Sequence, residues 1–173
     1  FSALTGKKEI MDLGSIKNKQ NKVFLISTTN GAETHSIQAA IETIKIFKKA
    51  NVIKYKKRIG QYFLKSVIKL IKIKKLQNYI KVVKCDWFPQ LIFYDKKNKL
   101  CDGLKTLIMQ EMFKNGVLFQ GYVIPSYTHN KKQIDYLINI LAKSFDIYNK
   151  ALEIGYKKYL FGDKIKPVFR KKN

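Results

Sequence analysis

Hydrophobic residues recur every three or four positions over three long stretches of the chain. In residues 31–49, the spacing of Ile37, Ala40, Ile41 and Ile44 predicts an amphipathic helix. A second helix follows, and the apolar face predicted for it holds Val52, Ile59, Phe63, Val67, Leu70 and Ile71. A third begins near Asn130, and its apolar stripe holds Ile134, Leu137, Ile138, Leu141, Phe145 and Tyr148. Each of these stretches predicts a helix that buries one face against a core.

Between the second and third of these helices the pattern shortens to runs typical of strands. Residues 80–83 and 91–94 read as two short strands, and residues 95–99 after them read as a polar turn. Residues 117–119 and 122–124 predict two more. Asp102 is expected to cap a helix that runs to Lys114 and stops at Asn115-Gly116. The sequence therefore predicts an α/β fold with a small mixed sheet and helices packed on it.

A strand, a turn and a helix follow one another near residue 30. The apolar residues 23–26 lead into Ser27 and Thr28, and the predicted helix follows. Free N–H groups at a helix N-terminus attract anions, and hydroxyl groups add further donors, so this turn is a candidate phosphate site. The other interpretation is an ordinary helix cap, in which Asn30 pairs with Glu33 three residues later.

The charge of the chain is strongly positive, at +23 from 35 Lys+Arg against 12 Asp+Glu. Only Arg58 and Arg170 are arginines, whereas bidentate phosphate contacts and base contacts favour arginine. The lysines are spread along the whole sequence, which favours a solvated surface over a specific nucleic-acid site. A basic module that binds nucleic acid or other anions remains an alternative, and it predicts lysines gathered on one face.

Hydrophobic residues make up 46% of the chain, so a packed core is expected. No run of 18 apolar residues predicts a membrane span, and we expect a cytoplasmic protein without a membrane partner. Cys85 and Cys101 form no CxxC pair, and with His35 and His129 they lack metal-ligand spacing. We therefore expect free thiols and no metal site.

Three segments resemble one enzyme family, in the family's own order. Residues 1–11 resemble the segment after the cofactor lysine of class III pyridoxal-phosphate-dependent aminotransferases. The closest likeness is to the branch around glutamate-1-semialdehyde 2,1-aminomutase. Residues 27–40 resemble that family's threonine-containing turn and the helix after it. Ser126 and His129, followed by Ile134 and Asp135, resemble its C-terminal "S-x-x-H … I-D" segment.

The resemblance implies an aspartate-aminotransferase-like (fold type I) enzyme that uses pyridoxal 5'-phosphate and forms an obligate homodimer. Residues 1–50 would be the tail end of the large cofactor-binding domain, and residues 51–173 the C-terminal small domain. The substrates would be a small amino donor and acceptor. The family's Schiff-base lysine falls upstream of the position matching Phe1, so no catalytic residue is assigned here. The fragment alone is expected to be inactive.

The resemblance also assigns a role to the turn near residue 30. Thr28 matches the threonine that donates to the cofactor phosphate across the dimer, and Ser27 precedes it where glycine is common. The aminomutases carry a glutamate near the active site where this chain has Phe119-Gln120-Gly121, so mutase and transaminase both remain open. A degenerate or split fragment that folds and dimerises without activity is a further alternative.

Overall fold

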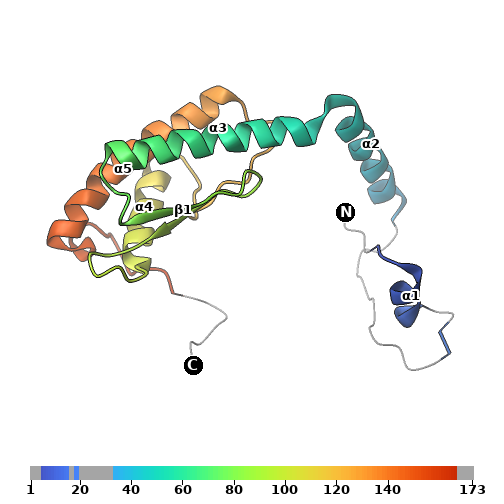
Figure 1. Cartoon of the computed structure of the whole chain (residues 1–173), viewed down its shortest axis with the longest axis horizontal. Helices are drawn as coiled ribbons and strands as arrows, with labels where there is room; N and C mark the ends of the chain where they lie inside the picture. The colour runs from blue at the N-terminus through green and yellow to red at the C-terminus, as the bar shows by residue number, and fades with distance from the viewer. Residues whose placement is uncertain (1–4, 16–17, 20–32, 167–173) are drawn as a thin grey trace. The chain divides into compact units, whose positions relative to one another are not determined.

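The computed structural model describes residues 5–15, 18–19 and 33–166 (Figure 1). Its contacts divide the chain into two compact units, Phe1–Asn51 and Val52–Asn173, which we describe separately. Their assignment to the tail of a large domain and to a small domain stays a prediction. The described residues mix helices with a small sheet, as expected for the α/β class, and helices predominate.

The described part of the first unit is helical. It contains α1 (Lys8–Met11), the 3-10 turn η1 (Asp12–Gly14) and α2 (Thr34–Ala50). Helix α2 has no buried residue, so its predicted apolar face is exposed at Ile41 and Ile44. The N-cap of α2 is Glu33, whose side chain makes no cap hydrogen bond. The capping pair predicted from Asn30 therefore falls on a residue outside the described ranges, as does the strand predicted at residues 23–27.

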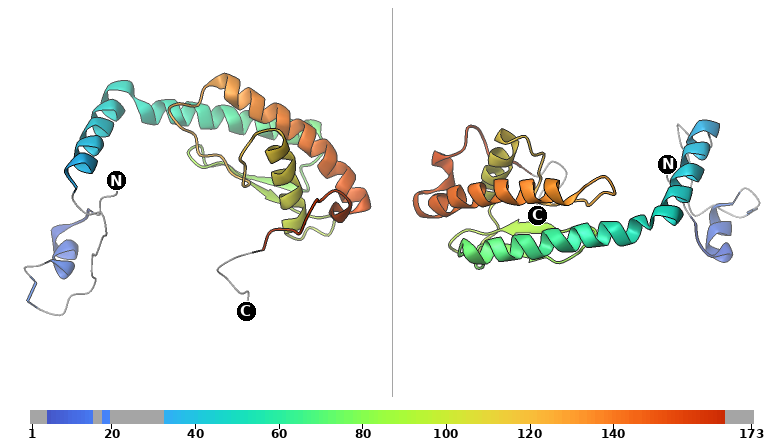
Figure 2. Two further views of the ribbon diagram at one scale, coloured as in Figure 1. Left: turned by 180° about the vertical axis from the view of Figure 1, so that it is seen from behind. Right: turned by 90° about the horizontal axis from the view of Figure 1, so that it is seen from above.

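The second unit is built from three long helices and two short strands. These are α3 (Val52–Ile73), β1 (Ile80–Val83), β2 (Gln90–Phe93), α4 (Asp102–Lys114) and α5 (Lys131–Ile154), followed by the 3-10 turn η2 (Tyr156–Lys158). Helices α3 and α5 lie side by side (Figure 2), α4 packs against α5, and the sheet contacts α3 through β1 and α4 through β2.

One hydrophobic core joins these elements. All six residues of the predicted apolar face of α3 are buried. The predicted stripe of α5 is also buried, except that Ile138 is half-buried and packs against the core. From α4 the core receives Leu104, Leu107, Ile108 and Met112. Burial of apolar area is the dominant favourable contribution to folding. The observed core confirms the apolar faces predicted for α3 and α5.

The sheet differs from the predicted one. It has two antiparallel strands, paired from Ile80↔Phe93 to Val83↔Gln90, rather than a mixed set of four. Residues 117–119 and 122–124 form no ladder, and only Tyr122 bridges to Gln90. Burial still alternates there, because Phe119 and Val123 are buried while Leu118 and Ile124 are exposed. Gly121 has φ +93, outside the β region, so pairing cannot extend through it.

The helix ends confirm the start predicted for α5 and correct the cap predicted for α4. Helix α5 begins after Asn130 as predicted, and Asn130 and Gln133 form a capping box in which the Gln133 N–H donates to Asn130 Oδ1 at 3.0 Å. Asp102 is not the cap of α4, because the N-cap is Cys101 and Asp102 is the first helical residue. In that first turn its carboxylate complements the helix dipole. Helix α4 ends at Lys114 as predicted.

The segment after α5 is held on α4 by one side-chain amide. Gln110 Nε2 donates to the carbonyl oxygen of Tyr159 at 2.9 Å, and Gln110 Oε1 accepts from the Phe161 N–H at 2.9 Å. Further on, the Ile165 N–H donates to Thr106 Oγ1 at 3.0 Å. A side-chain amide can make two such bonds because it carries both a donor and an acceptor. Residues 156–165 therefore form a strap along α4.

Tyr148 joins α5 to the sheet from inside the core. Its hydroxyl group donates to the carbonyl oxygens of Tyr94 at 2.8 Å and Tyr79 at 3.2 Å, and its ring lies 5.9 Å from that of Phe93. The side chain is fully buried. Burial raises the pKa of the Tyr148 hydroxyl well above its ordinary value, because a buried phenolate would lose its hydration.

We expect the free energy of unfolding to fall in alkali because of Tyr148. The folded state keeps this proton, while the unfolded chain releases it above about pH 10. The free energy of unfolding therefore falls above that pH, by up to about 1.4 kcal/mol per pH unit. Urea unfolding of the parent and of Tyr148→Phe checks this. The variant should be less stable at neutral pH by about 1 kcal/mol or more, and less sensitive to alkali. Equal alkaline slopes would contradict the assignment, and Tyr136→Phe, at an exposed position, is the control.

Candidate functional site

The predicted phosphate contact cannot be placed. Ser27 and Thr28 both lie outside the described residues, so their role stays a prediction. The first described residue after them is Glu33, whose Oε2 accepts from Ser36 Oγ at 3.4 Å and lies 3.2 Å from His35 Nε2. The described part of the chain therefore supports the predicted helix after the turn, but not the turn itself.

The S-x-x-H segment forms a closed turn in front of α5. The Ser126 N–H donates to His129 Nδ1 at 3.1 Å, and the hydroxyl groups of Ser126 and Thr128 lie 3.0 Å apart. Since Nδ1 accepts, the neutral ring of His129 carries its proton on Nε2. Tyr55 of α3 donates from its hydroxyl to the His129 carbonyl oxygen at 2.9 Å, and its ring meets Tyr127 edge-on. The turn is thereby fixed to α3.

Asp135 makes a second link between α5 and α3. It accepts a short hydrogen bond from the Tyr62 hydroxyl group. This bond to a carboxylate raises the pKa of the Tyr62 hydroxyl, because loss of its proton would leave two negative groups in contact. Lys131 Nζ lies 5.4 Å from the centre of the Tyr62 ring. The residues matched to the family segment thus hold two helices together.

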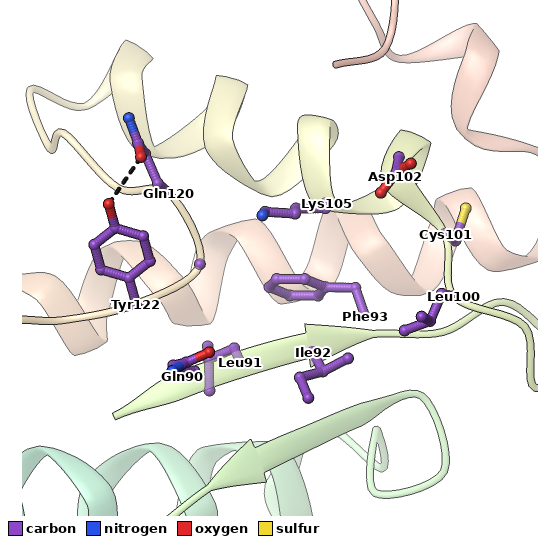
Figure 3. Close-up of a pocket in the computed structure, with 11 residues that line it drawn as sticks. Gln90, Leu91, Ile92, Phe93, Leu100, Cys101, Asp102, Lys105, Gln120 and Tyr122 are labelled. Atoms are coloured by element: carbon purple, nitrogen blue, oxygen red, sulfur yellow. Dashed lines mark hydrogen bonds between the residues drawn. The ribbon is translucent and has the colours of Figure 1, made fainter. Parts of the chain in front are cut away.

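A hollow of about 210 Å³ opens between β2, the start of α4 and residues 120–122 (Figure 3). Lys105, from the second turn of α4, extends across it toward Gln120 and Tyr122. Gln120 Oε1 accepts from the Tyr122 hydroxyl group at 2.9 Å. Side chains from three separate segments therefore converge on one space, and all of them lie within the second unit.

This hollow offers binding groups. Lys105 supplies a positive charge, and Gln120 and Tyr122 supply an amide and a hydroxyl group. The Cys101 sulfur points away from the hollow in Figure 3. Within the described ranges, no hydrogen bond pairs a cysteine or serine side chain with a histidine side chain in the way nucleophilic catalysis requires. The arrangement can hold and orient a polar ligand.

The sequence did not single out Lys105. Its only signal was membership of the predicted helix 102–114, and one lysine among 35 Lys+Arg carries no information by itself. The fold brings Lys105 next to Gly121, where a Cβ on residue 121 would lie 3.3 Å from Lys105 Cε. A side chain on residue 121 would crowd the lysine stem. The missing signal is a contact between segments distant in sequence.

Cysteine and histidine side chains do not gather in the part of the chain that the structure describes. Cys85 and Cys101 are free thiols, and no three residues among His, Cys, Asp and Glu could share a metal ion in those ranges. Lysines lie on α2, α3, α5, the turn at residues 96–99 and the strap. The alternative of a basic binding module with one charged face therefore stays a prediction.

Comparisons with known proteins give no assignment: no family model matches the chain, and a search of curated proteins finds no match. The described helices include none that combines the length and the apolar character needed to cross a membrane.

Proposed function

We propose that the chain is the C-terminal portion of a pyridoxal-phosphate-dependent class III aminotransferase or aminomutase, which works as a homodimer on small amino and carbonyl compounds. The cofactor would supply the electron sink for amino transfer. Residues 27–28 would contribute donors to its phosphate, and residues 51–173 would form the small domain. The lysine that anchors the cofactor would belong to a preceding part of the enzyme.

The observation that supports the proposal most is the structure of the S-x-x-H … I-D segment. Each polar residue that carries the resemblance has a defined partner, with His129 bound to Ser126 and Asp135 bound to Tyr62. Lys7 and Lys8 are both exposed, which agrees with a cofactor lysine elsewhere in the enzyme.

Gln120 bears on which reaction the enzyme would carry out. It stands where the aminomutases have a glutamate, and it lines the hollow beside Tyr122. An amide cannot take up and release a proton as a carboxylate does. The proposal therefore favours transamination over the mutase reaction, with the amino donor and acceptor left open.

We expect Thr28→Ala to weaken cofactor binding by about ten- to a hundredfold in the complete dimer, because a hydrogen bond to a charged group contributes roughly 1.5–3 kcal/mol. Thr28→Ser should lose much less, since the hydroxyl group remains. The measurement is pyridoxal-phosphate dissociation, followed by absorbance. Thr43→Ala is the matched control, because its hydroxyl group donates only to the Ala39 carbonyl oxygen within α2.

Two outcomes would overturn the proposal. If Thr28→Ala binds the cofactor as tightly as the parent, the site assignment is wrong and Thr28 is an ordinary cap. If residues 1–173 alone form a lysine-linked aldimine with pyridoxal phosphate, the mapping onto the family is wrong, because the anchoring lysine would then lie within this chain.

A further inference from the structure

The edge of β2 that faces the hollow has open hydrogen-bonding positions. The Tyr94 N–H donates to the Tyr79 carbonyl oxygen. The backbone N–H and C=O groups of even-numbered residues in this strand therefore point toward β1, and those of odd-numbered residues point to the opposite edge. On the outward edge, the Leu91 N–H donates to the Gly121 carbonyl oxygen at 2.7 Å. The Phe93 carbonyl oxygen accepts from the Cys101 N–H at 3.0 Å. Two chain segments thus border this edge and leave a gap between them.

Within that gap, two backbone groups have no partner among the contacts of the described residues. They are the carbonyl oxygen of Leu91 and the N–H of Phe93. Both residues are buried, at 5% and 3% exposure. Backbone groups at buried positions are nearly always paired in folded proteins, so water or a ligand that enters the hollow is expected to satisfy them.

Lys105 adds a charge to the same place. A Cβ on Gly121 would lie 3.3 Å from Lys105 Cε, 3.5 Å from the Leu91 carbonyl oxygen and 3.7 Å from the Phe93 ring. The lysine stem and the open strand edge therefore meet in the space that glycine leaves empty. No acidic side chain pairs with Lys105 among the described ion pairs, although Asp102 lies at the rim.

We propose that the hollow binds a small carboxylate that carries an O–H or N–H donor next to the carboxyl group. One carboxylate oxygen accepts from the Phe93 N–H and the other from Lys105, while the adjacent donor bonds to the Leu91 carbonyl oxygen. Two donors match the two oxygens of a planar carboxylate, whereas a phosphate would bury additional oxygens without partners. A volume of about 210 Å³ admits an acid of a few carbon atoms.

The test is a titration of the full chain, residues 1–173, with L-lactate, followed by ¹⁵N-¹H NMR at constant ionic strength. We expect a saturable downfield shift of the Phe93 amide proton, with a dissociation constant on the order of millimolar, as suits a ligand this small. Acetate, which lacks the neighbouring donor, should bind about threefold or more weakly. This site needs no cofactor, so its failure and the failure of the proposed function are distinguishable.

Variants separate a ligand site from a water-filled hollow. Lys105→Gln should weaken lactate binding by about tenfold or more, because it removes the charge and keeps much of the stem. Lys99→Gln, at an exposed position in the preceding turn, should leave it unchanged. The proposal is overturned if the Phe93 amide shows no saturable shift, if Lys105→Gln binds as well as the parent, or if inorganic phosphate binds as tightly as lactate.

Discussion

Gly60→Ala should lower the free energy of unfolding by about 3 kcal/mol or more, a large share of the roughly 5–15 kcal/mol by which folded domains are stable. A Cβ at this position of α3 would lie 1.6 Å from the Asp86 carbonyl oxygen and 3.2 Å from the Pro125 ring. The first of these atoms belongs to the backbone, so relief requires α3 to move away from the segment between β1 and β2. Urea unfolding followed by circular dichroism measures the loss.

Gly162→Ala is the matched control, because a Cβ there meets nothing within 4 Å. It should change stability by no more than about 0.5 kcal/mol. If Gly60→Ala folds as stably as this control, the close approach of α3 to residue 86 is wrong.

Phe145→Ala should cost about 3–5 kcal/mol, since it removes a large side chain from the centre of the core and leaves a cavity. Phe145 is fully buried, whereas Phe161 on the strap is 81% exposed. Phe161→Ala removes the same atoms and loses mainly the contact with Lys114 Nζ, which lies 4.0 Å from the ring centre, so about 0.5–1 kcal/mol is expected. Thermal unfolding of both variants checks the pair, and equal losses would contradict the placement of Phe145.

Local patterns predicted most of the helices and both strands of the sheet. The helical periodicity of α3 and α5 extends over many turns, so a single polar interruption does not obscure it. The strand over residues 80–83 was predicted with its observed bounds, and that over 91–94 begins and ends one residue early in the structure. For α3, α5 and the two strands these successes have one cause, since the apolar side of each of these elements faces the same core.

The errors arise where structure depends on a single dihedral angle or on a distant partner. Asp102 was expected to cap α4, but Cys101 has the extended dihedral angles of the N-cap, which residue type alone does not fix. Strands were predicted on both sides of residue 120, but the positive φ of Gly121 ends the pairing there. Pairing is a long-range property, so an alternating pattern can exist without a ladder.

The two candidate sites differ in whether a local sequence pattern could predict them. Ser27 and Thr28 came from a local pattern and a family resemblance, and they lie outside the described residues. The hollow beside Lys105 came from the fold, because its walls belong to β2, α4 and residues 120–122. A local pattern in the sequence does not show that these three segments come together in the fold.

The strap has a consequence for how the chain folds during synthesis. Its bonds to α4 join residues 49 to 59 positions apart, whereas the bonds within α4 span four positions. Helices form from local contacts in about a microsecond, and a ribosome adds roughly 5–20 residues each second. Gln110 and Thr106 therefore lack their bonds to the strap for seconds after α4 is synthesised, until residues 156–165 leave the ribosome. During that interval the side of α4 that binds the strap is not covered by it.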